Sequence, residues 1–299
     1  MEAIFNDKYK KLIKNINMDK FVNIFTNSVN KLSPIKNHNY KRNVKYTLND
    51  YIFGIIDVLK NFISWNSYNG LIKGDTLRKK HIEFNKLGVY EDIYTTLLTK
   101  QLKKNKCKQL KYQSMDSSNI RDLVGNKFSE YNFNCKNQKG YSSKCIKINA
   151  LVTTNGIPLS IDVNKGNIYD SKLFSKTINN QIIQNDPKKY TKNNRYKQYF
   201  LADKGYDTKE IINEANKLGY ISIIPQNKRN IRNKKLLRYL NMQRIKILKK
   251  RHVVENFFSW IKKFPKIKHL YERKIDSYKG LLFMSLIIIL SRRVLNSNH

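Results

Sequence analysis

Three acidic residues stand in contexts that suit metal-dependent phosphodiester chemistry. Asp203 follows the apolar, β-prone run 199–202 and precedes Gly205, a pattern typical of a strand that delivers a carboxylate at its end. Asp116 lies in the run Gln-Ser-Met-Asp-Ser-Ser, and Glu255 lies in the stretch 251–262. Mg²⁺ prefers hard carboxylate oxygens, and paired ions can activate a nucleophile and stabilise a leaving oxygen. The three acids together therefore predict a Mg²⁺ site that acts on nucleic acid.

Each acid taken alone also has an ordinary structural explanation. Asp116 beside a serine suits a turn, Asp203 suits a cap of the next helix, and Glu255 suits an ion pair with Arg251 four residues earlier. The three come from distant parts of the sequence, as ligands of one site built from several strands and a helix must. Four further acids could be mistaken for ligands: Asp122, Asp162, Asp170 and Asp207.

Basic residues accompany the acids. Arg251, Glu255 and Lys262 are spaced by four and seven residues, which places them on one helical face and lets both cations hold phosphates. Lys204 directly follows the second acid. The run 227–235, which contains Arg229 and Arg232, is interpreted as a DNA-contacting loop in preference to a solvated charge run.

The charge of the whole chain indicates a polyanionic partner. The 299 residues include 59 Lys and Arg against 22 Asp and Glu, a formal net charge of +37. A codon bias toward Lys and Asn is the alternative explanation for part of this excess. The three cysteines form no CxxC pair and suggest no disulfide framework. The first residues lack a signal-peptide core, and the apolar run 281–290 is too short for a membrane span. We therefore expect a soluble, intracellular protein in the compartment that holds the DNA.

The hydrophobic pattern predicts a helical first part and a mixed second part. Helices are expected over 4–29, from the Thr47 cap to about residue 63, from the Thr76 cap to 87, and over 89–102. Strands are then expected at 111–117, 147–153, 159–163, 198–202 and 220–225, with helices at 171–179, 208–218 and 244–263. This order predicts an α/β (α+β mixed) fold: a ribonuclease-H-like catalytic core with a mixed five-stranded sheet over 106–299, preceded by a basic helical region over 1–105.

At these residues the chain resembles the DDE transposases of bacterial insertion sequences, most closely families four and five. Asp203 to Asp207 is similar to their second-acid block, and residues 113–118 to the first. Arg251-x3-Glu255-x6-Lys262 resembles the third-acid block of the Tyr-Arg-Glu-Lys signature branch, in which a Tyr usually stands three positions before the Arg. Here that position is Leu248, a departure from the pattern. Residues 139–171 resemble the family's segment after the first acid, and the segment from Tyr46 to Val89 resembles the preceding helical domain of family five.

The resemblance implies metal-dependent cleavage at the ends of a mobile element and transfer of the freed 3′-hydroxyl into target DNA. Asp116, Asp203 and Glu255 would hold Mg²⁺, with Mn²⁺ as a substitute, and the partners would be terminal repeats and target DNA, bound by a homodimer. Arg78 and Lys79 would lie near the groove if the helices after Thr47 and Thr76 form a helix-turn-helix-like reader. A helical platform for packing or dimerisation is the alternative. An inactive, transposase-derived DNA-binding protein and a nuclease without strand transfer are the competing functions.

Overall fold

The computed structural model describes residues 16–33, 45–61, 63–103, 106–122, 133–136, 142–183, 185–190, 197–227 and 240–295. The chain divides into two compact units. The helical unit comprises residues 1–101, 122–129 and 261–299, and the sheet unit comprises residues 102–121 and 130–260. Residues 261–299 thus group with the first hundred residues, whereas the sequence placed them with the catalytic region.

The strands of the sheet unit follow the predicted order. β1 (Tyr112–Asp122) pairs antiparallel with β3 (Ser142–Val152), which pairs antiparallel with β4 (Pro158–Lys165). On its other side β1 pairs parallel with β5 (Tyr199–Leu201), and β5 pairs parallel with β6 (Ile221–Ile223). The spatial order β4-β3-β1-β5-β6 is that of the expected ribonuclease-H-like core. The expected count of five is too low, because β2 (Phe133–Lys136) also pairs with β3.

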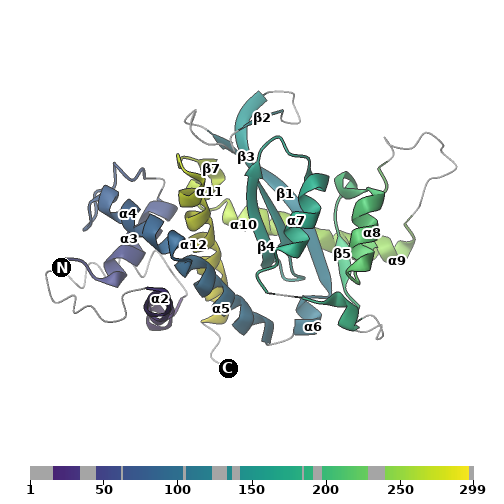
Figure 1. Ribbon diagram of the computed structural model, residues 1–299, viewed down its shortest axis with the longest axis horizontal. Coiled ribbons are helices and arrows are strands. Elements are labelled where there is room, and N and C mark those ends of the chain that lie inside the picture. The colour runs from purple at the N-terminus through teal and green to yellow at the C-terminus, as the bar shows by residue number, and fades with distance from the viewer. Residues whose placement is uncertain are drawn as a thin grey trace. The chain divides into compact units, whose positions relative to one another are not determined.

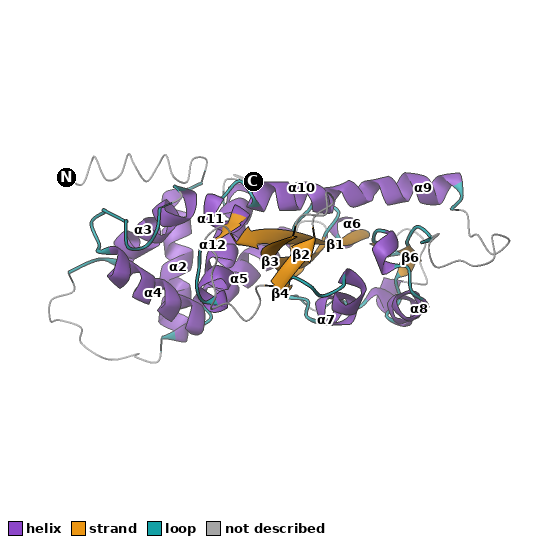
Figure 2. Ribbon diagram, turned by 90° about the horizontal axis from the view of Figure 1, so that it is seen from above, coloured by secondary structure: helices purple, strands orange, loops and turns teal. Residues whose placement is uncertain are grey.

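Helices cover both faces of this sheet. α9 (Met242–Leu248) and α10 (His252–Ile261) run along one face, while α7 (Phe174–Asn179) and α8 (Lys209–Lys217) lie on the other (Figure 2). A short helix, α6 (Lys106–Gln109), precedes β1 (Figure 1). The single helix expected over 244–263 is interrupted by a 3₁₀ turn at Lys249–Arg251 and ends at Ile261. Val254, Phe257 and Ile261 are buried, so the apolar stripe of α10 faces the core as its spacing predicts.

The cysteines of the sheet unit differ from expectation. Cys107 is a free thiol, but Cys145 on β3 is disulfide-bonded, so the prediction that no disulfide forms is wrong. The spacing of three cysteines carries no information about which residues strand pairing brings together.

The helical unit contains α2 (Met18–Leu32), α3 (Leu48–Lys60), α4 (Gly74–Lys86), α5 (Val89–Lys103), α11 (Pro265–Lys268), the short strand β7 (His269–Leu270) and α12 (Ile275–Val294). The predicted capping box at Thr47 is present, since its side chain and that of Asp50 each bond the other's backbone N–H. α4 begins at Gly74, so the predicted start at Thr76 is wrong. The chain packs closely here: a Cβ at position 74 would lie 1.6 Å from the Trp65 carbonyl oxygen.

α12 packs against α3, α4 and α11 in the core of the helical unit. Within the described residues, no helix combines the length and apolarity that a bilayer crossing requires. His81 on α4 is fully buried, and its Nε2 lies 2.9 Å from the Ser277 carbonyl oxygen, so this nitrogen donates. Its Nδ1 then accepts from the Tyr90 hydroxyl at 2.9 Å, and Trp65 stacks on the ring. Burial lowers the pKa of His81, so the neutral ring is the stable form.

Candidate active site

The parallel pairing of β1 with β5 brings the segments that carry the first two predicted acids side by side. Ser114 on β1 pairs with Leu201 on the parallel strand β5. Asp116 lies two residues further along β1, and Asp203 lies two residues beyond the end of β5, near enough for its negative charge to raise the pKa of Asp116. Asp203 begins a 3₁₀ turn, and its Oδ1 accepts from the Gly205 N–H at 2.7 Å. A Cβ at position 205 would lie 2.9 Å from that oxygen, so glycine allows the turn to close on the carboxylate.

One arginine joins the first acid to the third. Arg251 Nη1 donates to Asp116 Oδ2 at 2.9 Å, and its Nη2 donates to Glu255 Oε1 at 2.5 Å. The planar guanidinium presents parallel donors, so it holds two carboxylates at once. Asp116 is only 21% exposed, whereas the Glu255 side chain is 56% exposed. Residues that are 135 positions apart thus meet, and the Arg251–Glu255 ion pair, which is the ordinary structural explanation for Glu255, is present.

Asp116 is the electrostatic centre of the cluster. Burial raises the pKa of its carboxyl to about 6, which is the largest influence on that group. The Ser117 N–H at 2.8 Å and the Arg251 cation lower this pKa, while the negative charges of Asp203 and Asp170 raise it. Three carboxyl groups therefore interact electrostatically around one buried position.

Asp170 and Lys147, which are not among the predicted site residues, adjoin this cluster through Ser117. Asp170 Oδ1 accepts from the Ser117 hydroxyl at 2.6 Å and from Lys147 Nζ at 2.7 Å. Lys147 is buried on β3 and also donates to the Ile168 carbonyl oxygen at 2.6 Å. Asp170 was considered only as an acid that could be mistaken for a ligand. The available signal was Lys147 itself, a cation placed between isoleucines in a strand and hence in need of an acid.

The family match covers this whole cluster. Residues 113–290, more than half of the chain, match the family described as the transposase DDE domain. The chain belongs to this transposase family. No curated protein and no solved structure matches it. The matched segment begins at the first residue of the predicted first-acid block and contains Asp116, Asp203 and Glu255.

The donor set of this transposase suits a divalent cation, although the acids are not arranged around one. Among the described residues, no group of three or more His, Cys, Asp or Glu side chains is gathered closely enough to hold a metal. Arg251 instead forms ion pairs with both Asp116 and Glu255. Carboxylates that raise one another's pKa repel, and a divalent ion with oxygen ligands relieves such repulsion. The chemistry of the donors therefore fits the metal.

The remaining predicted residues of the transposase are spread more widely. Lys204 is exposed beside Asp203. Lys262 lies in the turn after α10, within the helical unit, and burial lowers its pKa. Arg78 and Lys79 lie on α4, within 3.9 Å and 3.1 Å of Asp75. Arg229 and Arg232 lie outside the described residues.

Two of the other acids have structural partners. Asp162 pairs with Lys176, and Asp207 Oδ2 accepts from the Asn227 N–H at 2.8 Å. Asp122 is the last residue of β1. Of the four acids that could be confused with ligands, only Asp170 is seen to act on Asp116 within the described part of the chain.

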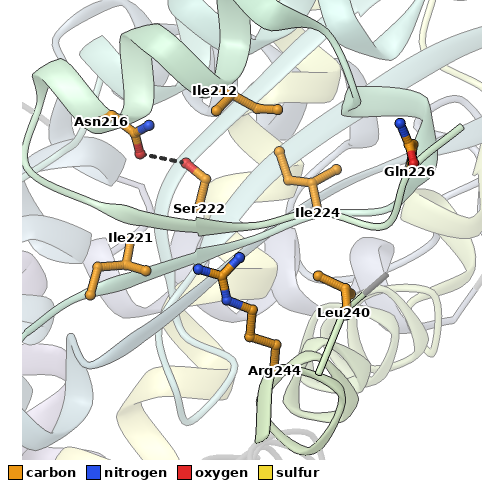
Figure 3. Close-up of a pocket in the computed structure, with 8 residues that line it drawn as sticks. All are labelled: Ile212, Asn216, Ile221, Ser222, Ile224, Gln226, Leu240 and Arg244. Atoms are coloured by element: carbon orange, nitrogen blue, oxygen red, sulfur yellow. Dashed lines mark hydrogen bonds between the residues drawn. The ribbon is translucent and has the colours of Figure 1, made fainter. Parts of the chain in front are cut away.

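A separate cavity of about 230 Å³ lies where α8, β6 and α9 approach one another (Figure 3). Arg244 reaches into it from α9, and the Ser222 hydroxyl donates to Asn216 at 3.3 Å across its wall. Isoleucines form much of the remaining lining, and none of the three predicted acids contributes to it. We assign this cavity no part in the chemistry of the acids.

Proposed function

We propose that this chain is a DNA transposase that cleaves DNA at the ends of a mobile element and transfers the freed 3′-hydroxyl into target DNA. The proposal is supported chiefly by the parallel pairing of β1 with β5 just before Asp116 and Asp203, together with the Arg251 link from Asp116 to Glu255. The family match supports the transposase class. Assignment to insertion-sequence families four and five remains part of the proposal and is based on the motif spacing.

In this proposal Asp116, Asp203 and Glu255 hold Mg²⁺, or Mn²⁺ in its place. The metal would supply an activated nucleophile and stabilise the charge that develops on the scissile phosphate. These three carboxylates would hold the ions, and the largely buried setting of Asp116 would strengthen its interaction with a cation. Lys204 and Lys262 would contact phosphates on either side of the reacting bond, and Arg229 and Arg232 would contact DNA nearby.

Arg251 has a dual role in this proposal. It neutralises Asp116 and Glu255 when no metal is bound. A phosphate offers the guanidinium an alternative bidentate partner, so DNA binding would draw Arg251 away and free both carboxylates for metal. We therefore expect DNA to tighten Mg²⁺ binding, and by linkage Mg²⁺ to tighten DNA binding by the same factor. In an Arg251→Ala variant this coupling should disappear.

The proposal is tested with DNA taken from both sides of the reading frame, where the ends of an element would lie. The wild-type protein should produce Mg²⁺-dependent nicks and joined products, and Asp203→Asn should lose both while still binding the DNA. Asp186→Asn, a change at an exposed acid outside the cluster, is the matched control. Cleavage by Asp203→Asn at the wild-type rate would refute the catalytic assignment, and cleavage without joined products would indicate a nuclease.

A further inference from the structure

The helical unit contains a cavity of about 310 Å³ that takes no part in the acid cluster. Its lining comes from the segment after α3, from α4, from α11 and from the turn that precedes α12. Three cations contribute to it, Arg78, Lys266 and Arg273, beside one acid, Glu272. Trp65 and Tyr271 supply aromatic walls. The pocket thus has an excess of positive charge and the size of a site for a small molecule.

The single acid of this pocket is already occupied by neutral donors. The Glu272 carboxylate accepts from the Trp65 indole N–H at 2.9 and 3.1 Å and from the Ser277 hydroxyl at 2.6 Å. Lys266 Nζ lies 3.8 Å from the nearer carboxylate oxygen, which is beyond hydrogen-bond distance. The acid therefore holds the pocket wall in place and balances only part of the charge.

The cations of the pocket are only partly balanced within the described part of the chain: Lys266 has a long ion pair with Glu272 at 3.8 Å and lies 5.5 Å from the centre of the Tyr271 ring. Lys266 is 3% exposed, and burying an ammonium group without a hydrogen-bonded anion is costly. Arg78 Nε is buried with no hydrogen-bond acceptor among the described residues, and the nearest acid oxygen, on Asp75, is 3.9 Å away. Arg273 is exposed at the rim. An anion with several oxygens is the kind of ligand that a cavity lined by these three cations favours.

We propose that this pocket binds a phosphate group of the DNA backbone. A phosphate has oxygens enough for a guanidinium fork and an ammonium group together. The volume admits the phosphate together with an attached sugar, and the net charge of +37 favours DNA as its source. This inference depends on the proposed function in one respect, namely that the protein binds DNA. Such a contact positions the protein on DNA without reading its sequence.

The DNA arm of the test measures binding of a labelled duplex over a range of salt concentrations. Loss of one phosphate contact should lower the slope of log K against log salt by about 0.9. Arg273→Ala should show this decrease. Lys86→Ala, which removes an exposed lysine from the last turn of α4 outside the pocket, should change the slope by much less. Equal slopes for the two variants would overturn the proposal.

The second arm uses inorganic phosphate and the fluorescence of Trp65. The chain has two tryptophans, so a Trp260→Phe background leaves Trp65 as the sole reporter. Duplex DNA should change this signal, and Lys266→Met, checked for folding by circular dichroism, should abolish the change. A response to phosphate with no response to DNA would refute DNA as the ligand. Because neither arm measures cleavage, an inactive enzyme that still shows the Arg273 effect would remove the catalytic proposal and leave this one standing.

Discussion

Replacing Asp116 by asparagine should remove a pH dependence from the stability of the folded protein. Burial and two neighbouring acids raise the pKa of Asp116 to about 6, against an ordinary value of 3.8. Between these two values the folded state binds a proton that the unfolded state has released. The free energy of unfolding should therefore decrease as pH rises through about 6, since ionisation costs more in the folded state.

The size of the effect follows from the difference in pKa. A rise from 3.8 to about 6 corresponds to about 3 kcal/mol of lost stability once Asp116 is fully ionised. Roughly half of this loss, about 1.5 kcal/mol, falls between pH ~5 and ~7.5, where most other carboxyl groups are already ionised in both states. Asparagine has nearly the same shape and no charge, so the Asp116→Asn variant should lack this component.

The assay is denaturant unfolding of wild type and variant at both pH values, with the difference between the two proteins taken at each pH. This difference cancels the titration of groups that the proteins share. Asp186→Asn, at an exposed position, is the control and should follow wild type. Mg²⁺ should stabilise the wild type at the higher pH and much less at the lower, because protons compete for Asp116. If the wild-type and Asp116→Asn curves run parallel across both pH values, the pKa of Asp116 is ordinary and the reasoning fails.

Three further substitutions test the surroundings of Asp116 and the helical core. Asp170→Asn removes a charge that raises the pKa of Asp116, so the midpoint of the wild-type pH transition should move below about 6 in the same unfolding assay. Arg251→Ala removes a positive charge that lowers the pKa of Asp116, so the midpoint of the pH transition should move upward. If the midpoint moves in the same direction in both variants, the opposite effects assigned to Asp170 and Arg251 are wrong. Gly280→Ala would place a Cβ 2.7 Å from His81 Cε1, on a ring fixed by two hydrogen bonds, and should cost ~1–3 kcal/mol by thermal unfolding. An exposed helical glycine would gain ~1 kcal/mol from alanine, so a stabilised variant would mean that the ring can move.

Local patterns in the sequence predicted most of the fold. The hydrophobic pattern located β3 and β4, and the Thr47 cap located the start of α3. β2 was missed, and α4 begins before the expected cap because its first turn packs closely against the Trp65 backbone. Such errors arise where contacts between distant residues decide the local structure.

The sequence predicted which acids belong to the candidate site, but not how they contact one another. The acids could be named because each sits at the expected point of a strand or helix. Their electrostatic relation could not, since it depends on Arg251 reaching across to β1 and on Lys147 fixing Asp170. Lys147 and Asp170 are 23 positions apart and meet only because Lys147 lies on β3 beside β1, whose Ser117 also bonds Asp170. Sequence spacing does not encode such a contact.

Arg251 explains why a cluster of acids can exist in the folded protein before any metal binds. Asp116 is buried and repelled by two other acids, and its carboxylate is balanced by a guanidinium that it shares with Glu255. A positively charged side chain that could not move away from Asp116 and Glu255 would always compete with a metal ion for these two carboxylates. Arg251 is instead 23% exposed at the start of α10, so its side chain can turn toward an incoming phosphate without unfolding the helix. The raised pKa of Asp116 and its ion pair with Arg251 are therefore two consequences of one arrangement, and the proposed function expects DNA to compete with both carboxylates for Arg251.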